Sequence, residues 1–416
     1  MKTPLRFCFV TTFYPPYSFG GDGIDIERLA TALVARGHHV TVVYDEDAFE
    51  SLSDARPAAP AATSIEVIGL KSRFGRLSPL LSHQFGYPVV HGRRLSRLFR
   101  DRPFDVVMFH NVSLAGGPGL FGFGGDALKI YLAHEHWLVC PTHVLWRHDR
   151  EPCSGRQCLR CVLHYRRPPQ LWRSTGSLER QSRRIDVFLA RSEFSRDAHR
   201  RFGFSRPIEI FPSFLPETEA STRDRPHARP YFLIAGRLER MKGIHTVIPA
   251  FAHSVDADLV IAGDGAQAEA LRALASDNRR VVFLGRVPAA ELDRYYHHAL
   301  AVIAPQLGYE TFGLVLIEAM RQGTPVIARR IGPFPEIVGD AGLLYSRDEE
   351  LTTGLRRLET DEGFRSDLGR RGRERFLERW TESIVLDRYF NILARAARER
   401  AAARGGPVPA WVAEAS

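Results

Sequence analysis

Short apolar runs alternate with amphipathic segments through the first half of the chain. Mostly apolar runs predict strands buried on both faces at residues 7–10, 40–44, 106–109 and 129–133. Between the first two runs, apolar residues recur at helical spacing over 25–36, and Gly37 ends that pattern. Buried strands that alternate with helices are typical of a parallel, doubly wound α/β domain.

The same rhythm returns after a proline-rich stretch at 211–230, which predicts a linker. Strands are then expected at 231–235, 258–262, 281–284, 301–304 and 325–328, and helices at 245–251, 267–275, 290–299 and 314–321. We therefore expect two Rossmann-like α/β domains, over 1–214 and 215–383, followed by a helix and tail over 384–416.

The length and composition exclude several classes of protein. A chain of 416 residues suits two large domains, and 44% hydrophobic with 25% charged residues is too apolar for a disordered protein. No apolar run approaches the ~20 residues of a membrane-spanning helix. Residues 7–13 are typical of a strand rather than of a signal peptide. We expect a soluble, cytoplasmic protein.

The net charge of +9 comes almost entirely from arginine. Of the 57 basic residues, 53 are arginines and only Lys2, Lys71, Lys129 and Lys242 are lysines, which is typical of a GC-rich coding sequence. The basic residues form no concentrated patch interleaved with aromatic side chains, so we expect no nucleic-acid partner. The same bias makes each lysine more informative than an arginine.

The second half of the chain carries cations at the end of a predicted strand. Gly236 and Arg237 follow the strand at 231–235, and Lys242 and Gly243 come shortly afterwards. Two fixed cations beside backbone glycines at a strand end suit a diphosphate group. A solvated surface position is the alternative, chiefly for Arg237.

A helix expected at 314–321 offers a second site for an anion. Its first turn carries no acidic side chain, so its free N–H groups are available to a bound phosphate. Those N–H groups belong to Gly313, Leu314 and Val315. Glu310 lies in the loop that leads into this helix. Glu318 lies on the helix, where its carboxylate can accept two hydroxyls of a ribose.

The first half has a glycine turn in place of a dinucleotide fingerprint. Gly20 and Gly21 precede the first predicted helix, but the G-x-G-x-x-G spacing is missing, so a nicotinamide cofactor loses its main support. A glycine pair still lets a ligand approach the backbone and the start of the helix closely. An ordinary glycine turn is the alternative.

A cysteine-rich insertion spans residues 140–161. Its cysteines are Cys140, Cys153, Cys158 and Cys161. This spacing is compatible with one structural zinc ion held by four thiolates, and the final C-x2-C pair is typical of a zinc knuckle. In a reducing cytosol such thiols are more often metal ligands than disulfides. Packed or free thiols are the alternative, and His136, His143 or His148 can replace one ligand.

These motifs resemble those of family 4 of the retaining glycosyltransferases, the glycosyl transferases group 1, which have the GT-B fold. In the second half the resemblance rests on Gly236-Arg237…Lys242-Gly243, Glu310 with Glu318, and Gly323-Thr324-Pro325-Val326-Ile327. In the first half it rests on Pro15-Pro16…Gly20-Gly21, Arg36-Gly37-His38 and Phe109-His110-Asn111. It extends over nearly the whole chain. It implies two Rossmann-like doubly wound domains that face each other across a cleft, with the acceptor on the first and the nucleotide sugar on the second.

The resemblance also implies a role for each matching residue. Glu310 would contact the donor sugar and Glu318 the nucleotide ribose, while Arg237 and Lys242 would hold the diphosphate. These assignments agree with the chemistry that the residue types suggest on their own.

Members of the family also carry a histidine near the sugar being transferred. The matching stretch places His134 there, with His136 as the second choice. The sequence offers no convincing general base that an inverting reaction would require, and His134 is the nearest candidate. The resemblance implies a retaining reaction. In it the leaving diphosphate helps to deprotonate the acceptor, and Arg237 and Lys242 stabilise the charge that develops on that diphosphate.

The implied activity is transfer of a sugar from a UDP-, GDP- or ADP-sugar to a glycan or lipid-linked acceptor, in cell-surface polysaccharide or glycoconjugate synthesis, with no cofactor for catalysis. A sugar phosphorylase of similar fold would need a lysine for pyridoxal phosphate, and none of the four lysines suits it. A non-catalytic nucleotide-sugar-binding module is expected to lack the acidic pair, yet Glu310 and Glu318 are both present.

One acidic segment matches a different signature. Asp45-Glu46-Asp47 follows a predicted strand and fits the D-x-D motif of metal-dependent glycosyltransferases. GT-B enzymes use cationic side chains and a helix N-terminus where other folds use a metal. We therefore expect this segment to be a solvated loop.

Residues 90–102 predict a cationic, amphipathic helix. One side carries Leu95, Leu98 and Phe99, and the other carries Arg94, Arg97 and Arg100. Such a helix can lie on an anionic membrane surface, which predicts peripheral contact with the inner face of the membrane. The alternative is that the three apolar side chains pack into the core of the protein itself.

Overall fold

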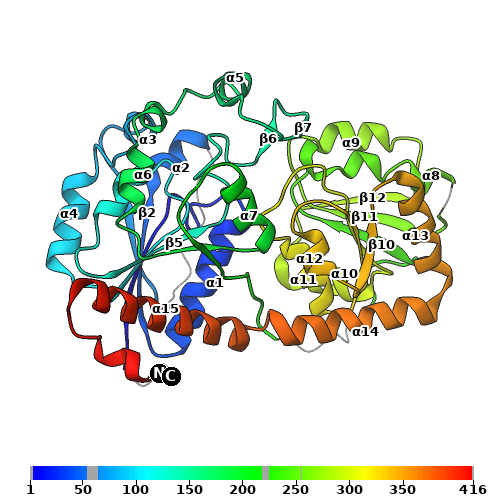
Figure 1. The fold of residues 1–416 in the computed structure, drawn as a ribbon. Coiled ribbons are helices and arrows are strands. Elements are labelled where there is room, and N and C mark those ends of the chain that lie inside the picture. Colours follow the sequence, from blue (N-terminus) through cyan, green and yellow to red (C-terminus); the bar gives the residue numbers. More distant parts are fainter. Residues whose placement is uncertain (1–2, 54–63, 218–223, 254, 415–416) are drawn as a thin grey trace.

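Residues 3–53, 64–217, 224–253 and 255–414 are described by the computed structural model. They form two large parallel β-sheets, each covered by helices, and a small two-stranded hairpin (Figure 1). The first sheet has 7 strands in the order β3-β2-β1-β4-β5-β8-β9, and the second has 6 strands in the order β12-β11-β10-β13-β14-β15. In each sheet the order reverses beside the first strand, which is the doubly wound arrangement that the sequence predicts.

All neighbouring strands within the two large sheets are parallel. The first sheet consists of β1 (Arg6–Val10), β2 (His39–Asp45), β3 (Glu66–Leu70), β4 (Val106–Phe109), β5 (Leu128–Ala133), β8 (Val187–Ala190) and β9 (Ile208–Ile210). The second consists of β10 (Tyr231–Ala235), β11 (Asp258–Ala262), β12 (Val281–Gly285), β13 (Val302–Ala304), β14 (Val326–Arg329) and β15 (Gly342–Tyr345).

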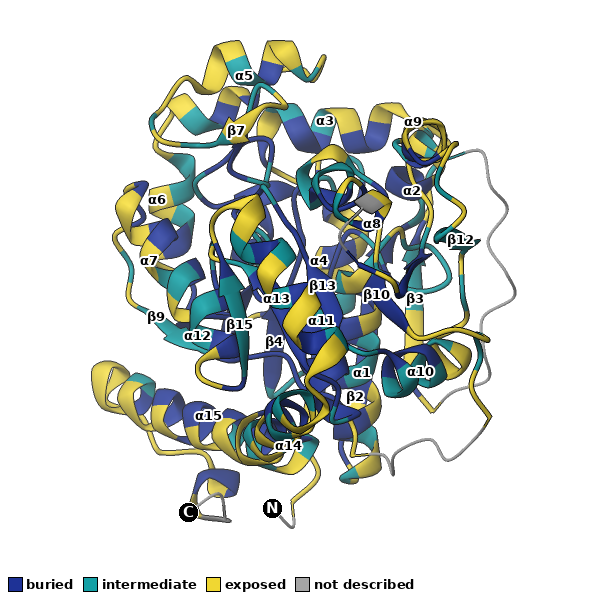
Figure 2. Ribbon diagram, turned by 90° about the vertical axis from the view of Figure 1, so that its right-hand side faces the viewer, coloured by how far each residue is buried: buried dark blue, intermediate teal, exposed yellow. Residues whose placement is uncertain are grey.

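Helices cover both faces of each sheet, with their exposed sides turned outward (Figure 2). In the first half they are α1 (Gly21–Ala35), α2 (Glu46–Leu52), α3 (Leu77–Phe85), α4 (Gly92–Asp101), α5 (Cys158–His164), α6 (Ser177–Ser182) and α7 (Glu193–Arg201). In the second half they are α8 (Ala250–His253), α9 (Ala268–Leu274), α10 (Ala289–His298), α11 (Leu314–Arg321), α12 (Phe334–Val338), α13 (Asp348–Thr360) and α14 (Glu362–Arg379). The last helix is α15 (Glu382–Arg404).

Apolar side chains pack on both faces of each sheet. Along β1, Phe7 and Phe9 belong to a core cluster on one face, and Cys8 and Val10 belong to a second cluster on the other. The second sheet likewise separates two clusters. Because both faces are covered, strand residues are apolar in continuous runs, and this is why the sequence reveals these strands.

The chain crosses between the two halves twice, and the crossings lie side by side. The Leu215 N–H donates to the Trp380 carbonyl at 3.0 Å, and Leu215 forms a parallel bridge with Thr381. β9 and β10 belong to different sheets, so the change of sheet falls within the expected linker. Residues 218–223 of that linker lie outside the described part of the chain. The limits expected for the domains stay a prediction.

The C-terminal segment does not form a separate tail. After the second crossing, α15 runs back along the first half, where Tyr389 is fully buried against Phe7 and Phe211 (Figure 1). Trp411 and Val412 are buried in the same cluster. The helical pattern of α15 is visible in the sequence, but it does not say which sheet the helix covers.

Some local expectations are wrong. Residues 245–251 do not form one helix: single 3-10 turns and the short α8 replace it, because Pro249 cannot donate the N–H that a helix interior requires. The strands β3, β9 and β15 are not predicted. β3 and β9 are edge strands of the first sheet and β15 is an edge strand of the second, so their partly exposed sequences lack a long apolar run.

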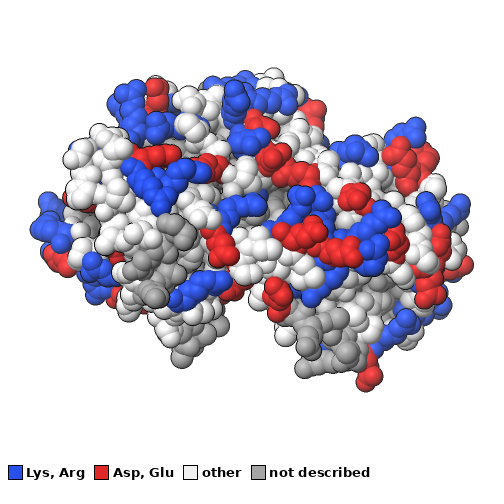
Figure 3. Space-filling view, turned by 60° about the horizontal axis from the view of Figure 1, so that its bottom comes forward, with Lys and Arg blue, Asp and Glu red and all other residues white. Residues whose placement is uncertain are grey.

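On the face shown in Figure 3, basic and acidic side chains are interspersed, and the outline is hollowed between the two halves. Among the residues that the structure describes, no helix is long and apolar enough to cross a membrane.

Candidate active site

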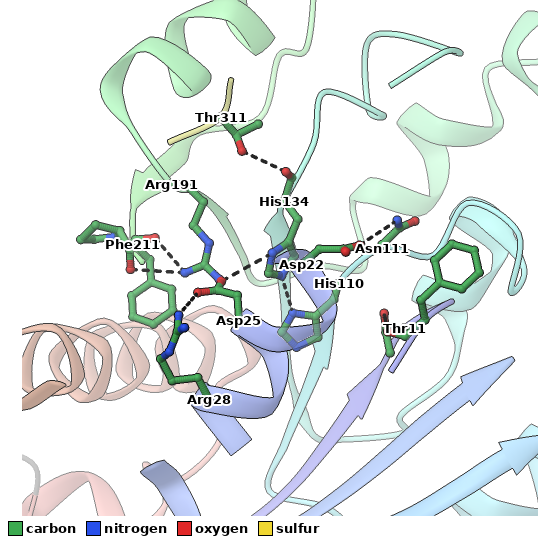
Figure 4. A network of polar contacts seen from close by, with 12 residues as sticks. Thr11, Asp22, Asp25, Arg28, His110, Asn111, His134, Arg191, Phe211 and Thr311 are labelled. Atoms are coloured by element: carbon green, nitrogen blue, oxygen red, sulfur yellow. Dashed lines mark hydrogen bonds and ion pairs between the residues drawn. The ribbon is translucent and has the colours of Figure 1, made fainter. Parts of the chain in front are cut away.

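A buried ion pair lies where α1 meets the end of β8 (Figure 4). The carboxylate of Asp25 contacts the guanidinium of Arg191, and both side chains are almost completely buried. Arg28 lies 3.4 Å from the same carboxylate. Arg191 also donates to the backbone carbonyls of Phe211 and Pro212, at 3.4 and 3.3 Å, in the segment that leads out of the first half. The ion pair therefore ties α1 to the first crossing.

Two histidines continue this network. His134 follows β5, and its Nδ1 lies 3.7 Å from the Asp25 carboxylate, while its Nε2 lies 2.9 Å from Nδ1 of His110. Burial lowers the pKa of His134 to about 4 and holds the pKa of His110 well below its usual range, so both rings are neutral at pH 7. The carboxylate favours the proton of His134 on Nδ1, which leaves Nε2 to accept from His110.

The second-choice histidine lies elsewhere. His136 is buried between the rings of Phe194 and His199, and burial holds its pKa well below the usual range. His134, unlike His136, lies in the network with Asp25 and His110. Its place beside the transferred sugar stays a prediction.

Contacts between the halves place a loop of the second half beside His134. The Thr311 hydroxyl donates to the His134 carbonyl at 2.9 Å, and the Ser192 hydroxyl donates to the Thr311 carbonyl at 2.6 Å. The carboxylate of Glu336 accepts the first N–H groups of α7, both at 2.9 Å. These bonds close the two halves onto each other around residues 310–313.

Two helix N-termini meet at this place. The helix α1 begins after Gly20 and α11 begins after Gly313, and neither has a side-chain cap. A β-carbon added to Gly21 would lie 3.7 Å from the side chain of Leu314. The structure thus brings the Gly20–Gly21 turn and the free N–H groups of α11 together, as an anion site requires.

Lys242 and Glu310 form an ion pair at the same loop. The Lys242 Nζ lies 2.5 Å from the Glu310 carboxylate, and both side chains are largely shielded from solvent. A tight turn after β10 positions the lysine: Gly243 has a φ of +72°, and a β-carbon there would lie 2.1 Å from the Pro305 carbonyl. Only glycine fits this approach. Two residues that the sequence places 68 positions apart are therefore partners.

The remaining predicted residues lie around this pair. Glu318 on α11 accepts a hydrogen bond from the Tyr296 hydroxyl at 2.6 Å. Arg237 is exposed, and its guanidinium pairs with Glu239 at 2.8 Å. Burial lowers the pKa of Arg28 on α1, and the charge of Glu318 opposes that shift, so Arg28 lies within electrostatic range of the expected ribose site.

Several residues of this site were not predicted. Arg191 follows a strand, but it is one of 53 arginines, so the sequence gives it no prominence. Asp25 lies on a predicted helix face, Tyr296 belongs to no motif, and Thr311 lies between Glu310 and Glu318 with no role of its own predicted. Their positions become informative only when the two halves come together.

The acidic segment at the end of β2 is buried, and the expected solvated loop is wrong. Asp45 caps α2 by accepting the Ala48 N–H at 3.0 Å, and burial raises its pKa to about 7. Asp47 accepts from the Ser72 hydroxyl at 2.6 Å and contacts His91 at 3.1 Å. The segment folds inward because its carboxylates hold α2 and the start of α4 in place.

The amphipathic helix expected at 90–102 is α4. Leu95 is fully buried, and Leu98 and Phe99 pack partly against the same core cluster. The apolar side of α4 is therefore used within the first half, while its arginines stay exposed.

Two family models match the chain. Glycosyltransferase Family 4 matches residues 19–219, and Glycosyl transferases group 1 matches residues 217–375. Glycogen synthase of Mycobacterium tuberculosis H37Rv is 27% identical over 363 residues, which cover 80% of each chain. Phosphatidyl-myo-inositol mannosyltransferase of Propionibacterium freudenreichii is 30% identical over 251 residues, covering 55% of this chain and 62% of the relative.

Solved structures share the fold. Sucrose-phosphate synthase from Thermosynechococcus elongatus superposes with a TM-score of 0.71 at 20% identity, covering 94% of this chain and all of the other. HepE of Anabaena, determined in complex with UDP-glucose, gives a TM-score of 0.64 at 17% identity, with 94% and 100% covered.

Buried neutral histidines predict acid sensitivity. Between pH 6.5 and about 4, the unfolded chain binds protons on residues such as His134 and His110 that the folded chain does not, so the free energy of unfolding falls as the pH falls. The slope is up to about 1.4 kcal/mol per pH unit for each histidine. Asp45 has the opposite effect: because its pKa is raised in the folded chain, its protonation makes the free energy of unfolding rise as the pH falls.

Urea denaturation at pH 7, 6 and 5 measures this effect. We expect the free energy of unfolding to fall steadily, with a shallower slope in His134→Gln. Stability that is constant or increases toward pH 5 would contradict the assignment of neutral, buried rings.

Proposed function

Because the chain belongs to the family 4 glycosyltransferases, which have the GT-B fold, we propose that it transfers a sugar from a nucleotide-sugar donor to an acceptor with retention of configuration. The single observation that carries this proposal is the Lys242–Glu310 pair beside the uncapped N-terminus of α11. It supplies a cation, a carboxylate and free N–H groups at one place.

The diphosphate of the donor binds at this cation. Lys242 contacts one phosphate, and the N–H groups of Gly313, Leu314 and Val315 contact the other. Arg237, exposed on the same loop, adds a second cation. The phosphate takes the place of the Glu310 carboxylate at Lys242, which frees Glu310 to accept hydroxyls of the donor sugar.

The ribose binds at Glu318. The Tyr296 hydroxyl already holds one of its carboxylate oxygens, at 2.6 Å, so the side chain is oriented before the nucleotide arrives. Such preorganisation reduces the entropy lost on binding.

Retention follows from the chemistry available to the acceptor. In the reaction the bond between the anomeric carbon and the diphosphate oxygen breaks, and a bond to the acceptor oxygen forms on the same face. The acceptor proton passes to the leaving diphosphate. His134 is a poor general base, since burial lowers its pKa and its Nε2 already accepts from His110. Lys242 and the α11 N-terminus stabilise the charge on the leaving group.

A UDP-, GDP- or ADP-sugar serves as donor, and a glycan or lipid-linked molecule as acceptor, in the synthesis of cell-surface polysaccharide or glycoconjugate. The UDP-glucose complex of the Anabaena neighbour supports a nucleotide sugar. Relatives named for glycogen synthesis and for mannosylation of phosphatidyl-myo-inositol support a glycan or a glycolipid acceptor.

The outer surface of α3 supports work at a membrane. Leu77, Leu80 and Phe85 are 57%, 43% and 59% exposed, while Ser78 and Ser82 of the same helix are buried. A helix that turns its apolar side to solvent marks an interaction surface. We propose that this side enters the headgroup region of the inner membrane face. The arginines of the next helix, Arg94, Arg97 and Arg100 of α4, contact anionic lipids there.

The donor site is tested by turnover. A panel of UDP-, GDP- and ADP-sugars in a thermal-shift assay first identifies the donor, because a bound ligand raises the melting temperature. With that donor, Lys242→Ala and Glu310→Gln should each lower kcat by ~10² or more. Lys71→Ala, which removes an exposed lysine far along the chain from this loop, is the matched control. Near-normal turnover in both site variants would disprove the assignment.

Membrane contact is tested by co-sedimentation with anionic vesicles. We expect the protein to bind at low salt and to dissociate as salt rises, since each basic residue contributes about 1 kcal/mol near the lipid. Arg94/Arg97/Arg100→Gln and Leu77/Leu80→Ser should each weaken binding. Leu274→Ser, at a leucine of the second half that is 52% exposed, should leave it unchanged. Wild-type protein that stays in the supernatant at low salt would contradict the proposal.

A further inference from the structure

The first turn of α7 is held by a carboxylate from the other half of the chain. The N–H groups of Glu193 and Phe194 donate to the oxygens of Glu336, one to each, and both bonds measure 2.9 Å. Glu336 lies in the first turn of α12, in the second half, whereas α7 follows β8 of the first half. Each carboxylate oxygen therefore accepts a hydrogen bond that crosses between the halves.

These two bonds complete the hydrogen bonding of the helix start. The first N–H groups of a helix have no partner within it. Ser192 caps α7 by accepting the Ser195 N–H at 3.0 Å, and Glu336 accepts the two N–H groups before it. The helix dipole also favours a negative charge at this end. Burial raises the pKa of Glu336, and the N–H donors of Phe194 and Glu193 oppose that rise, so they favour the charged carboxylate.

Phe194 links this helix start to the donor loop. Its ring centroid lies 4.9 Å from that of Tyr309, which directly precedes Glu310. Both side chains pack against a small core cluster of Cys140, Leu145, Ala198 and Phe202. The ring contact therefore fixes the backbone just before Glu310 from the side of the first half.

The cysteine-rich insertion takes part in this packing only in part. Cys140 is buried in the cluster and Cys153 packs against it, whereas Cys158, at the start of α5, is exposed. The zinc site expected at these residues and Cys161 stays a prediction.

The loop before α12 meets the same two rings. Gly332 has a φ of +56°, a left-handed conformation that glycine adopts most readily. A β-carbon there would lie 3.7 Å from the Phe194 ring, the Tyr309 ring and the Glu310 backbone nitrogen. Glu336 follows in the same segment. This segment of the second half therefore contacts both the N–H groups and the first ring of α7, next to Glu310.

We propose that Glu336 is a positioning residue for sugar transfer: by holding the start of α7, it keeps the Phe194 ring against Tyr309 and fixes the backbone that carries Glu310. The contact stands on its own geometry. Its effect on turnover rests on the proposed function, because that effect assumes that Glu310 accepts hydroxyls of the donor sugar.

The kinetic effect falls on kcat more than on donor affinity. Under the proposed function, Lys242 binds the diphosphate and Glu318 binds the ribose, and Tyr296 rather than Glu336 orients Glu318. Loss of the Glu336 contact therefore leaves most of the donor affinity in place but misplaces the carboxylate at the reacting sugar. A displacement of about 1 Å can cost ~10²-fold in rate.

Hydrogen exchange tests the contact without any substrate. The amides of Glu193 and Phe194 should exchange slowly in the wild type and at least ~10-fold faster in Glu336→Ala. Glu336→Gln keeps one acceptor oxygen and should give an intermediate rate. Glu362→Ala, at an exposed acidic residue in the first turn of α14, is the matched control and should change neither amide. Exchange within β10 should be the same in all variants if the fold is intact.

Equal exchange of the two amides in the wild type and in Glu336→Ala would overturn the contact. Turnover of the donor identified by thermal shift tests the positioning role. Glu336→Ala should lower kcat by about 10-fold or more while the donor KM changes less than about 3-fold. Glu336→Gln should recover part of the loss, and Glu362→Ala should behave like the wild type.

Three results would overturn the positioning role: an unchanged kcat in Glu336→Ala, an equal loss in Glu362→Ala, or a change confined to the donor KM. Lys242→Ala separates this failure from that of the proposed function. If Lys242→Ala loses turnover while Glu336→Ala keeps it, only the positioning role fails. Near-normal turnover in Lys242→Ala would disprove the donor site and the kinetic role together, and the exchange rates would still decide the contact.

Discussion

The buried ion pair between Asp25 and Arg191 sets the positions on which the site depends. Two charges removed from water are stable only when each keeps the other as a partner. Asp25 therefore holds α1 at a fixed distance from the end of β8. Ser192, which follows Arg191 in the chain, donates a hydrogen bond from its hydroxyl to the Thr311 carbonyl. The first N–H groups of α7 donate to the Glu336 carboxylate. The buried Asp25–Arg191 ion pair therefore lies next to the hydrogen bonds that join the two halves.

The same dry surroundings divide the chemical roles between the halves. Burial in the first half keeps His134 and His110 neutral and bonded to each other, which suits orientation better than proton transfer. In the second half, Lys242 pairs with Glu310 beside the uncapped start of α11. Under the proposed function, stabilisation of a leaving diphosphate would fall to the second half, and the first half would shape the space around the acceptor.

Much of this arrangement can be predicted from the sequence, for reasons that differ between residues. Strands covered on both faces appear as apolar runs, and the limits of α11 follow from its apolar spacing and flanking glycines. Lys242 is recognisable because lysine is rare here, but its pairing with Glu310 leaves no sign in the sequence. Arg191 is hidden among many arginines, and the burial of Asp45 depends on Ser72 and His91, which are distant in the sequence. Long-range contacts of this kind leave no local pattern.

A double-mutant cycle on Asp25 and Arg191 tests the role of the ion pair most directly. Urea denaturation would compare Asp25→Ala, Arg191→Met and the double variant with the wild type. Each single variant removes the most deeply buried partner of the remaining charge and should lose about 3–5 kcal/mol of unfolding free energy. The double variant leaves no such charge, so its loss should be no larger than that of either single variant. Losses that are small and simply add would contradict the view that this pair fixes α1 against the end of β8.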